Sequence, residues 1–349
     1  MSPYILGVDG GTTKTIALVA DMNGNVLGAA RGGNSNWTGD DVTVPMEVVA
    51  ATAREALHAA GATPTDIRVA VFGLAGADWP EDYARRQAAL EAANLAQRIV
   101  VRNDAIAGWR GGTRQTYGAV IAAGTGSNTC ILTPDGHEWC YGYYVFYGGA
   151  IDVAQDALQA VLRAEDGRGR PTTLTDSVLR QLGYVSTEAL LKGMVAGKIS
   201  QAALLSLCPL TFEVAAEGDE VATDLIVKQG AALGEYAAAA IRRFDMQALT
   251  FDVVLAGSVF KGRGPLLIDT VTQVIHRTAP GAAIVRAALE PAAGALLLAY
   301  DELGVPVTDD ILATIRETMP DPQLFATGEA APPSLVGLEY RNTTWTAEA

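Results

Sequence analysis

The sequence predicts an α/β protein of two lobes, each with a βββαβα core. Two strand patterns with matching internal turns occur, one at the N-terminus and one from Tyr117. Each pattern is followed by segments that alternate between helical and strand periodicity. The chain of 349 residues also exceeds the size at which single hydrophobic cores usually stop growing, which favours two domains.

The two patterns have the same internal order. In YILGVDGGTTKTIALVADMNGNVL, an apolar strand enters a tight turn of glycines and hydroxyl residues, and a second apolar strand reaches a hairpin turn at Asn23-Gly24 before the third strand. The second pattern, YGAVIAAGTGSNTCILTPDGHEW, repeats this order with its hairpin at Asp135-Gly136. Two phosphate-sized turns in one chain indicate one nucleotide held between two lobes.

The remaining elements alternate along each lobe. In the first lobe we expect a helix over 44–61, a strand over 67–74, a helix over 80–94 and a strand over 98–103. In the second lobe we expect helices between about 150 and 243, a strand over 251–257, a helix, a strand over 283–287 and a helix near 292–303. The glycine-rich segment 163–171 is either a solvated loop or a mobile lid.

These elements divide the chain into three parts. We expect residues 1–115 to form the first lobe, with the first phosphate turn, and residues 116–304 to form the second lobe, with a helical insertion. Residues 305–349 hold a short helical segment and then a stretch rich in Pro, Gly, Thr and Ala, a composition typical of disorder. We expect this part to pack on a lobe or on a partner subunit.

Composition excludes several classes of function. A net charge of −14 argues against nucleic-acid and anionic-membrane partners, both of which attract basic surfaces. No apolar run reaches the roughly 18 residues of a membrane span, and no signal-like segment opens the chain, so a cytoplasmic protein is expected. The three cysteines form no CxxC pair and the three histidines are scattered, which indicates neither a disulfide framework nor a zinc site.

The two turns have the composition of phosphate cradles, because glycines let backbone N–H groups approach an anion and hydroxyls add donors. The first turn matches neither a Walker A loop nor a Rossmann fingerprint, since a strand follows it where those motifs require a helix. The candidate phosphate-binding residues are Gly10, Gly11, Thr12, Thr13 and Lys14 in the first turn, and Gly124, Thr125, Gly126 and Ser127 in the second.

Two carboxylates lie where phosphoryl transfer needs them. Asp9 ends the first strand beside the first turn, where it either forms the turn or holds magnesium against phosphates. Asp104 lies at a strand-to-helix junction, where it either caps the helix or accepts the proton of the attacking hydroxyl. Position alone leaves both pairs of alternatives open.

The order of the motifs resembles the actin/sugar-kinase ATPase superfamily, and within it the N-acetylglucosamine kinase-like branch that includes the BadF/BadG-type ATPases. The resemblance spans about residues 4–303. Its motifs are DGGTTKT at 9–15, GGNSNW at 32–37, GLAGAD at 73–78, VRNDA at 101–105, AAGTGSN at 122–128, LAGS at 255–258 and PAAGA at 291–295.

The resemblance implies two actin-like (ribonuclease H-like) lobes with ATP and Mg²⁺ in the cleft between them. It implies that Asp104 is the catalytic base and that Asp9 is the magnesium-linked carboxylate, acting through water. Gly257 and Ser258 of LAGS fall where adenosine is approached. For PAAGA, helix packing is the simpler role.

The resemblance also suggests an acceptor site for a sugar or polyol. Asn36 matches the family asparagine that hydrogen-bonds sugar, and Trp37 offers a flat apolar wall; the alternative is a loop asparagine beside a core tryptophan. Gly76 and Asp78 are further candidates to line the cleft, as are Ser127 and Asn128.

The segment GYYVFYGGA at 142–150 departs from the family pattern. Relatives commonly carry a GDEGS-like acidic segment there, and its acidic pair falls on Phe146 and Tyr147. Aromatic residues, including Tyr143 and Tyr144, thus replace a sugar-binding carboxylate. This leaves three alternatives. Asp152 or another carboxylate replaces the lost one, the acceptor is less polar than N-acetylglucosamine or bound by stacking, or catalysis is lost.

Three functions of different classes follow. The first is an ATP-dependent kinase for an amino sugar such as N-acetylglucosamine or glucosamine, or for a different sugar or polyol, acting as a homodimer. The second is a BadF/BadG-type ATPase that activates another enzyme, which needs cysteines for an iron–sulfur cluster between subunits. The third is a non-catalytic nucleotide-binding protein, favoured by the altered segment alone.

Overall fold

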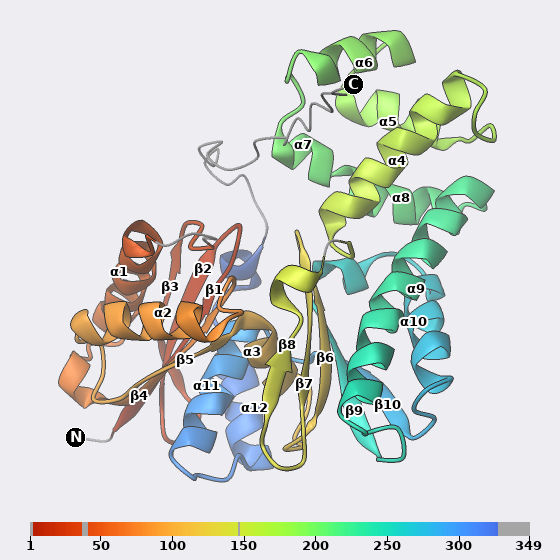
Figure 1. The fold of residues 1–349 in the computed structure, drawn as a ribbon. Coiled ribbons are helices and arrows are strands. Elements are labelled where there is room, and N and C mark those ends of the chain that lie inside the picture. The colour runs from red at the N-terminus through yellow and green to blue at the C-terminus, as the bar shows by residue number, and fades with distance from the viewer. Residues whose placement is uncertain (1–2, 37–40, 146, 327–349) are drawn as a thin grey trace, which may run out of the picture.

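The computed structural model describes residues 3–36, 41–145 and 147–326. It contains two five-stranded sheets, with strand orders β3-β2-β1-β4-β5 and β10-β9-β6-β7-β8. Strands β6 to β10 take the same relative places as β1 to β5, so the second sheet repeats the first (Figure 1). The predicted α/β fold of two similar lobes is confirmed.

The first sheet joins a meander to two parallel strands. Strands β1, β2 and β3 pair antiparallel, whereas β4 and β5 continue beside β1 in parallel. Helices α1 and α2 contribute to the core cluster that covers one face of this sheet. The elements are β1 (Tyr4–Gly10), β2 (Thr15–Asp21), β3 (Val26–Gly32), α1 (Thr43–Ala59), β4 (Ile67–Leu74), α2 (Pro80–Ala92) and β5 (Ile99–Asn103).

The second sheet has the same mixture of pairings, and two long helices cover its outer face. These elements are β6 (Gly118–Ala123), β7 (Ser127–Leu132), β8 (Glu138–Cys140), α9 (Glu220–Arg243), β9 (Phe251–Ala256), α10 (Leu266–His276) and β10 (Ala282–Arg286). The predicted strand over 283–287 is therefore displaced by one residue.

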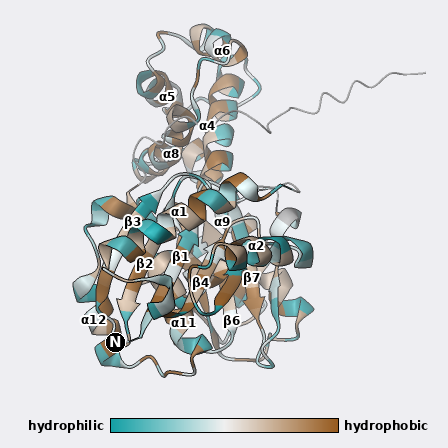
Figure 2. Ribbon diagram, turned by 90° about the vertical axis from the view of Figure 1, so that its left-hand side faces the viewer, coloured by the Kyte–Doolittle hydropathy of each residue, from teal (hydrophilic) through white to brown (hydrophobic). Residues whose placement is uncertain are grey.

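A helical region interrupts the second lobe between β8 and α9. It has its own hydrophobic cluster and stands off one end of the two sheets (Figures 1 and 2). Its helices are α4 (Ala150–Glu165), α5 (Leu174–Leu182), α6 (Thr187–Val195), α7 (Gln201–Leu205) and α8 (Leu207–Ala216). The described helices include none that is both long and apolar enough to cross a membrane.

The two sheets share an inner core. Helix α3 (Asp104–Arg110) follows the first sheet but also packs on β6 and β9, whereas α11 (Pro291–Glu302) follows the second sheet but packs on β1 and β4. One hydrophobic cluster therefore contains residues of both sheets together with α3, α11 and α12 (Asp309–Thr318). The final helix of the second lobe thus covers the first sheet.

Glycine makes this close packing possible. A Cβ on Gly7 of β1 would lie 2.5 Å from the backbone nitrogen of Leu296, and a Cβ on Gly294 of α11 would lie 1.9 Å from the carbonyl oxygen of Ala107. Both distances are far below van der Waals contact, so backbone approaches backbone where these two side chains are missing.

The expectation of no disulfide was wrong for one pair. Cys130 of β7 and Cys140 of β8 lie directly opposite in the antiparallel register, with Cα atoms 4.0 Å apart, and form a disulfide. The pairing depends on the register of the hairpin around Gly136, which cysteine spacing alone does not reveal. Cys208 is buried and unpaired.

We predict that Gly294→Ala lowers the free energy of unfolding by about 2 kcal/mol or more, because α11 or α3 must shift to admit the methyl group. Chemical denaturation of both proteins measures this difference. Gly33→Ala is the matched control: a Cβ at Gly33 meets no atom within 4 Å, so its effect should stay within about 0.5 kcal/mol. Equal effects of the two changes would contradict the packing argument.

Candidate active site

Three carboxylates gather where parallel strands of the first sheet end. Strands β1, β4 and β5 run parallel, so their carboxyl ends meet at one edge of the sheet. Asp9 is the penultimate residue of β1, Asp78 follows β4 by four residues, and Asp104 follows β5 directly. The charge of Asp104 contributes to raising the pKa of Asp9, and the charge of Asp78 contributes to raising the pKa of Asp104.

Asn103, and not Asp104, is the N-cap of α3. The Oδ1 atom of Asn103 accepts a hydrogen bond from the backbone nitrogen of Ala105 at 3.0 Å, and Asp104 is the first helical residue. Asp104 also accepts from the nitrogen of Ala105, at 2.9 Å. The capping role that competed with catalysis for Asp104 is thus filled by its neighbour.

The carboxyl of Asp104 is poised for proton transfer. Desolvation by the surrounding protein and the nearby charge of Asp78 together raise its pKa from 3.8 to about 7, and the hydrogen bond from Ala105 opposes the shift. A carboxyl whose pKa lies near neutrality can accept and release a proton at physiological pH.

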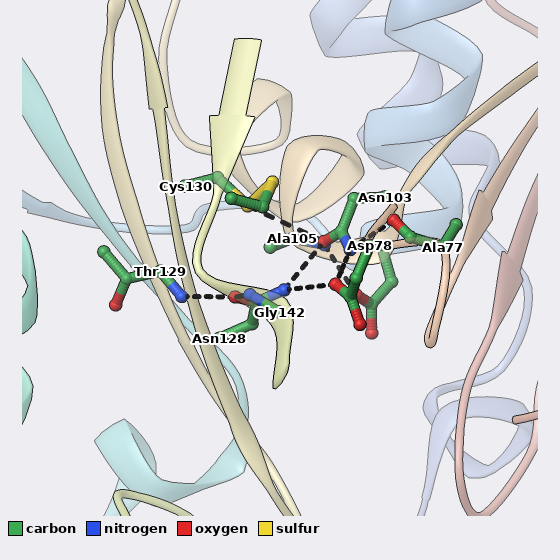
Figure 3. Close-up of a disulfide and its surroundings, with 10 residues drawn as sticks. Ala77, Asp78, Asn103, Ala105, Asn128, Thr129, Cys130 and Gly142 are labelled. Atoms are coloured by element: carbon green, nitrogen blue, oxygen red, sulfur yellow. Dashed lines mark hydrogen bonds between the residues drawn. A yellow bond between two sulfur atoms is a disulfide. The ribbon is translucent and has the colours of Figure 1, made fainter. Parts of the chain in front are cut away.

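A network of hydrogen bonds through Asn103 and Asn128 joins the two lobes (Figure 3). The Oδ1 atom of Asp78 accepts hydrogen bonds from Nδ2 of Asn103 at 2.9 Å and from Nδ2 of Asn128 at 3.1 Å. Asn128 belongs to β7 of the second sheet, and its Oδ1 accepts from the backbone nitrogen of Gly142 at 3.0 Å. Asp78 is therefore held from both sides of the junction between the lobes.

The disulfide borders this network. Sγ of Cys130 lies 3.7 Å from Oδ1 of Asn103, the atom that caps α3. Gly142, two residues beyond Cys140, has a φ of 54° and packs against Asp78, where a Cβ would lie 2.5 Å from that of the aspartate. Asn103 is thus a further residue of this site that the sequence analysis did not name. An Asn-Asp pair at a strand-to-helix junction, where asparagine is a preferred N-cap, could have indicated it.

Asp9 is the candidate metal ligand. Desolvation and the charge of Asp104 raise its pKa to about 7, while Lys14 opposes the shift. The described residues include no cluster of three or more acidic, histidine or cysteine side chains that could hold a metal ion. Magnesium is commonly held by one or two carboxylates together with substrate phosphates and water, which is the arrangement that Asp9 could serve.

The first turn is held by hydrogen bonds within itself and to the loop that follows β3. The nitrogen of Gly11 donates to the carbonyl of Lys14 at 2.9 Å, and Ser35 bonds back to the turn through its nitrogen to Gly11 at 3.1 Å. The hydroxyl of Thr15 donates to Ser35 Oγ at 2.8 Å. Nζ of Lys14 donates to the backbone carbonyl of Phe325, a contact that sequence reasoning did not anticipate.

The second turn is open on one side and supported on the other. A Cβ at Gly124 or Gly126 would meet no atom within 4 Å, whereas the start of α4 donates to the turn, from Ala150 nitrogen to the Gly124 carbonyl at 2.8 Å and from Ile151 nitrogen to the Thr125 carbonyl at 3.2 Å. The open side leaves the two glycines accessible to an anion.

The glycine of LAGS lies beside this turn. Gly257 has a φ of 101°, and a Cβ there would lie 2.3 Å from the carbonyl oxygen of Ala123, the last residue of β6. Ser258, which follows, is exposed and begins a short 3₁₀ helix. The hydroxyl of Ser127, at the end of the second turn, donates to the backbone carbonyl of Tyr147 at 3.4 Å.

The structure brings part of the predicted acceptor site to the first turn. Nδ2 of Asn36 donates to the hydroxyl of Thr12 at 3.0 Å, and its Oδ1 is buried without a hydrogen-bond partner among the described residues. Gly76 turns the chain toward Asp78 with a φ of 74°. Trp37 lies outside the described residues.

The aromatic segment is divided between surface and interior. Tyr144 is 69% exposed, and Phe146 lies outside the described residues. The Tyr147 hydroxyl donates to Asp156 of α4 at 2.5 Å, and Lys228 of α9 lies over its ring. Asp152 accepts from the nitrogens of Gly148 and Gly149, at 2.9 and 2.8 Å, and so secures the start of α4.

Comparisons with known proteins agree with this architecture. The family model described as the BadF/BadG/BcrA/BcrD ATPase family matches residues 6–299. An N-acetyl-D-glucosamine kinase of Dictyostelium discoideum is 27% identical over 85% of this chain and 97% of its own length. An N-acetylmuramic acid/N-acetylglucosamine kinase of Clostridium acetobutylicum is 24% identical over 86% of this chain and 99% of its own.

A solved structure of a candidate N-acetylglucosamine kinase from Chromobacterium violaceum superposes with a TM-score of 0.64. It is 26% identical to this chain and covers 85% of it and 99% of its own length. The superposition therefore extends over both sheets and is not confined to one lobe.

We predict that Asp78→Asn lowers the pKa of Asp104 by at least about half a unit, because one of the charges that raises it is removed while the Oδ1 acceptor is kept. Carbon-13 NMR titration of the Asp104 carboxyl measures the value directly. Asp176→Asn, at an exposed carboxylate on α5, should leave that pKa unchanged. An unchanged or higher value in Asp78→Asn would show that the charge of Asp78 does not act on the base.

Proposed function

The chain belongs to the BadF/BadG/BcrA/BcrD ATPase family, and on that premise we propose that it is an ATP-dependent kinase that phosphorylates a hydroxyl of a small sugar. The favoured acceptor is an amino sugar such as N-acetylglucosamine or glucosamine. The observation that carries the proposal is Asp104, a carboxyl with a pKa raised to about 7 at the strand edge that also bears Asp9 and the first phosphate turn.

Asp104 is the proposed general base. Its ionised carboxylate would accept the proton of the attacking hydroxyl, and burial beside Asp78 keeps its proton affinity high enough for that task. Asn103 holds the helix that carries Asp104, and Asn128 connects the same network to the second lobe. The base is thereby fixed relative to both lobes, as positioning of reactants requires.

ATP is the proposed phosphoryl donor. The open glycines of the second turn fit a phosphate because no side chain fills the space where their Cβ atoms would lie. The first turn adds backbone amides, threonine hydroxyls and Lys14, and Gly257 and Ser258 are the proposed adenosine neighbours. Asp9 fits a magnesium ion held through water, and the ion when bound supplies neutralisation of phosphate charge.

The acceptor site is proposed around Asn36, Gly76 and Asp78. The buried Oδ1 of Asn36 has no partner among the described residues, so a sugar hydroxyl or amide that donates to it would remove an unsatisfied acceptor. The names of the two curated relatives support an N-acetylated amino sugar. Because aromatic residues replace the acidic pair near 146–147, neutral sugars and polyols belong in any test.

The state of the three cysteines does not favour the alternative of an ATPase that activates another enzyme. Cys130 and Cys140 are bonded to each other and Cys208 is buried, so the described part of the chain presents no free surface thiolate for a cluster shared between subunits. A homodimer stays a prediction.

We predict that Asp104→Asn lowers turnover by about 10²–10⁴-fold, the usual contribution of a general base, while ATP still binds. ADP release with ATP and Mg²⁺ should be measured across amino sugars, N-acetylated sugars, neutral sugars and polyols, with ATP binding followed separately. Asp176→Asn serves as the matched control and should keep full turnover. Acceptor-dependent turnover that survives in Asp104→Asn would exclude this residue as the base, and silence of the wild type on every acceptor would remove the amino-sugar assignment.

We also predict that kcat/KM falls about tenfold per pH unit below pH 7 and levels off above it. The reason is that only the ionised carboxylate accepts a proton, and the pKa of Asp104 is raised to about 7. A pH series at constant ionic strength, with the protein checked for folding at each point, gives the midpoint. A midpoint near 4, the ordinary value for an aspartate, would mean that the observed base is a solvated carboxyl.

A further inference from the structure

The C-terminal segment beyond the family match reaches the first phosphate turn. The family match ends at residue 299, and α12 follows it on the first lobe with Leu312 and Ile315 buried in the inner core. The hydroxyl of Thr318, at the end of α12, accepts from the nitrogen of Val26 at 2.9 Å. Val26 is the first residue of β3, so the segment starts at the far end of this edge strand.

From there residues 319–326, which we call the strap, run along β3 toward the turn. Nη1 of Arg31, near the end of β3, donates to the carbonyls of Leu324 at 2.7 Å and Ala326 at 2.6 Å. The carbonyl between them, that of Phe325, accepts from Nζ of Lys14. The side chains of Leu324 and Phe325 pack partly against the inner core, which fixes the strap from the other side.

The hydrogen bond to Phe325 fixes where the ammonium group of Lys14 lies relative to the first turn. Lys14 is the single cation within residues 9–15, and its ammonium group has three N–H donors on a flexible stem. One donor goes to Phe325, and because its partner is a neutral carbonyl, the positive charge is not cancelled. Among the described residues no other hydrogen bond is made by this ammonium group, which leaves two donors for anionic oxygens, and part of the cost of ordering the side chain is met before a ligand arrives.

We propose that the strap is a positioning element for nucleotide binding: by holding Lys14 through the carbonyl of Phe325, it sets the affinity of the first turn for the phosphates of ATP. This rests on the proposed function only in that the turn binds ATP. Burial lowers the pKa of Lys14, and Asp9, Glu290, Arg31 and Lys261 are the charged groups that act on it. The strap therefore acts on a cation already placed among the carboxylates of the site.

The test measures binding of ATP with Mg²⁺ to the full-length protein by calorimetry, without an acceptor. The double variant Leu324→Ala/Phe325→Ala loosens the strap without changing any charge, and we expect it to weaken ATP binding about 3–10-fold. In assays with an acceptor, KM for ATP should rise by the same factor while kcat and KM for the acceptor stay unchanged. Ile311→Ala, a comparable truncation at the far end of the same segment, should leave ATP binding unchanged.

A double-mutant cycle shows whether the strap acts through Lys14. In a Lys14→Met background, loosening the strap should cause no further loss of ATP affinity. Arg31→Met releases the strap without touching the core but also removes a charge that acts on Lys14, so its effect is compared with and without Lys14→Met. Denaturation curves identify any variant that fails to fold. A further loss in the Lys14→Met background, unchanged affinity, or tighter binding on release would each overturn the proposal; tighter binding would mean that the strap withholds Lys14.

The outcomes also separate this inference from the proposed function. A protein that binds ATP as predicted but phosphorylates no acceptor on the panel would contradict the sugar-kinase proposal and leave the proposal about the strap standing. A wild-type protein that binds no ATP would overturn both.

Discussion

The close approach of α11 to β1 and α3 is the constraint on which the rest of the structure depends. Because Gly7 and Gly294 lack side chains, the helix lies directly against the backbone of both neighbours and ties the two sheets to one core. At that separation Asn128 of the second sheet reaches Asp78 beside the first. Side chains at these two glycine positions would push α11 away from β1 and α3, and so would disturb the core that joins the two sheets.

The active-site electrostatics follow from this packing. Asp9, Asp78 and Asp104 each lie close to the next and are desolvated, so each carries a raised pKa. Like charges at short range are unfavourable unless protons, amides or cations compensate them, and here Asn103, Asn128 and Lys14 do so in part. The raised pKa values mean that the folded chain gives up stability at neutral pH, a common cost of function that agrees with the proposed role of Asp104 as a proton acceptor.

Local sequence signals predicted most elements and the chemistry-bearing positions. The paired turns, the hairpins at Asn-Gly and Asp-Gly, and the strand over 67–74 needed only short-range patterns. The place of Asp104 after a strand made it a candidate, and its assignment as the base rests on the family resemblance and stays a prediction. The pairing of Cys130 with Cys140 and the contact of Lys14 with Phe325 could not be found this way. The first depends on hairpin register and the second joins residues 311 positions apart, for which a single sequence carries no local signal.

The shared core has a consequence for how the molecule is made. The first sheet is complete in sequence by Asn103, yet the helix that covers its inner face ends at Glu302. During synthesis that face has only α3 against it while the whole second sheet is translated, although domains ordinarily fold in turn from the N-terminus. A nascent chain of this protein therefore carries an exposed apolar sheet for most of its time on the ribosome, and acquires its native interior only as the last helices emerge.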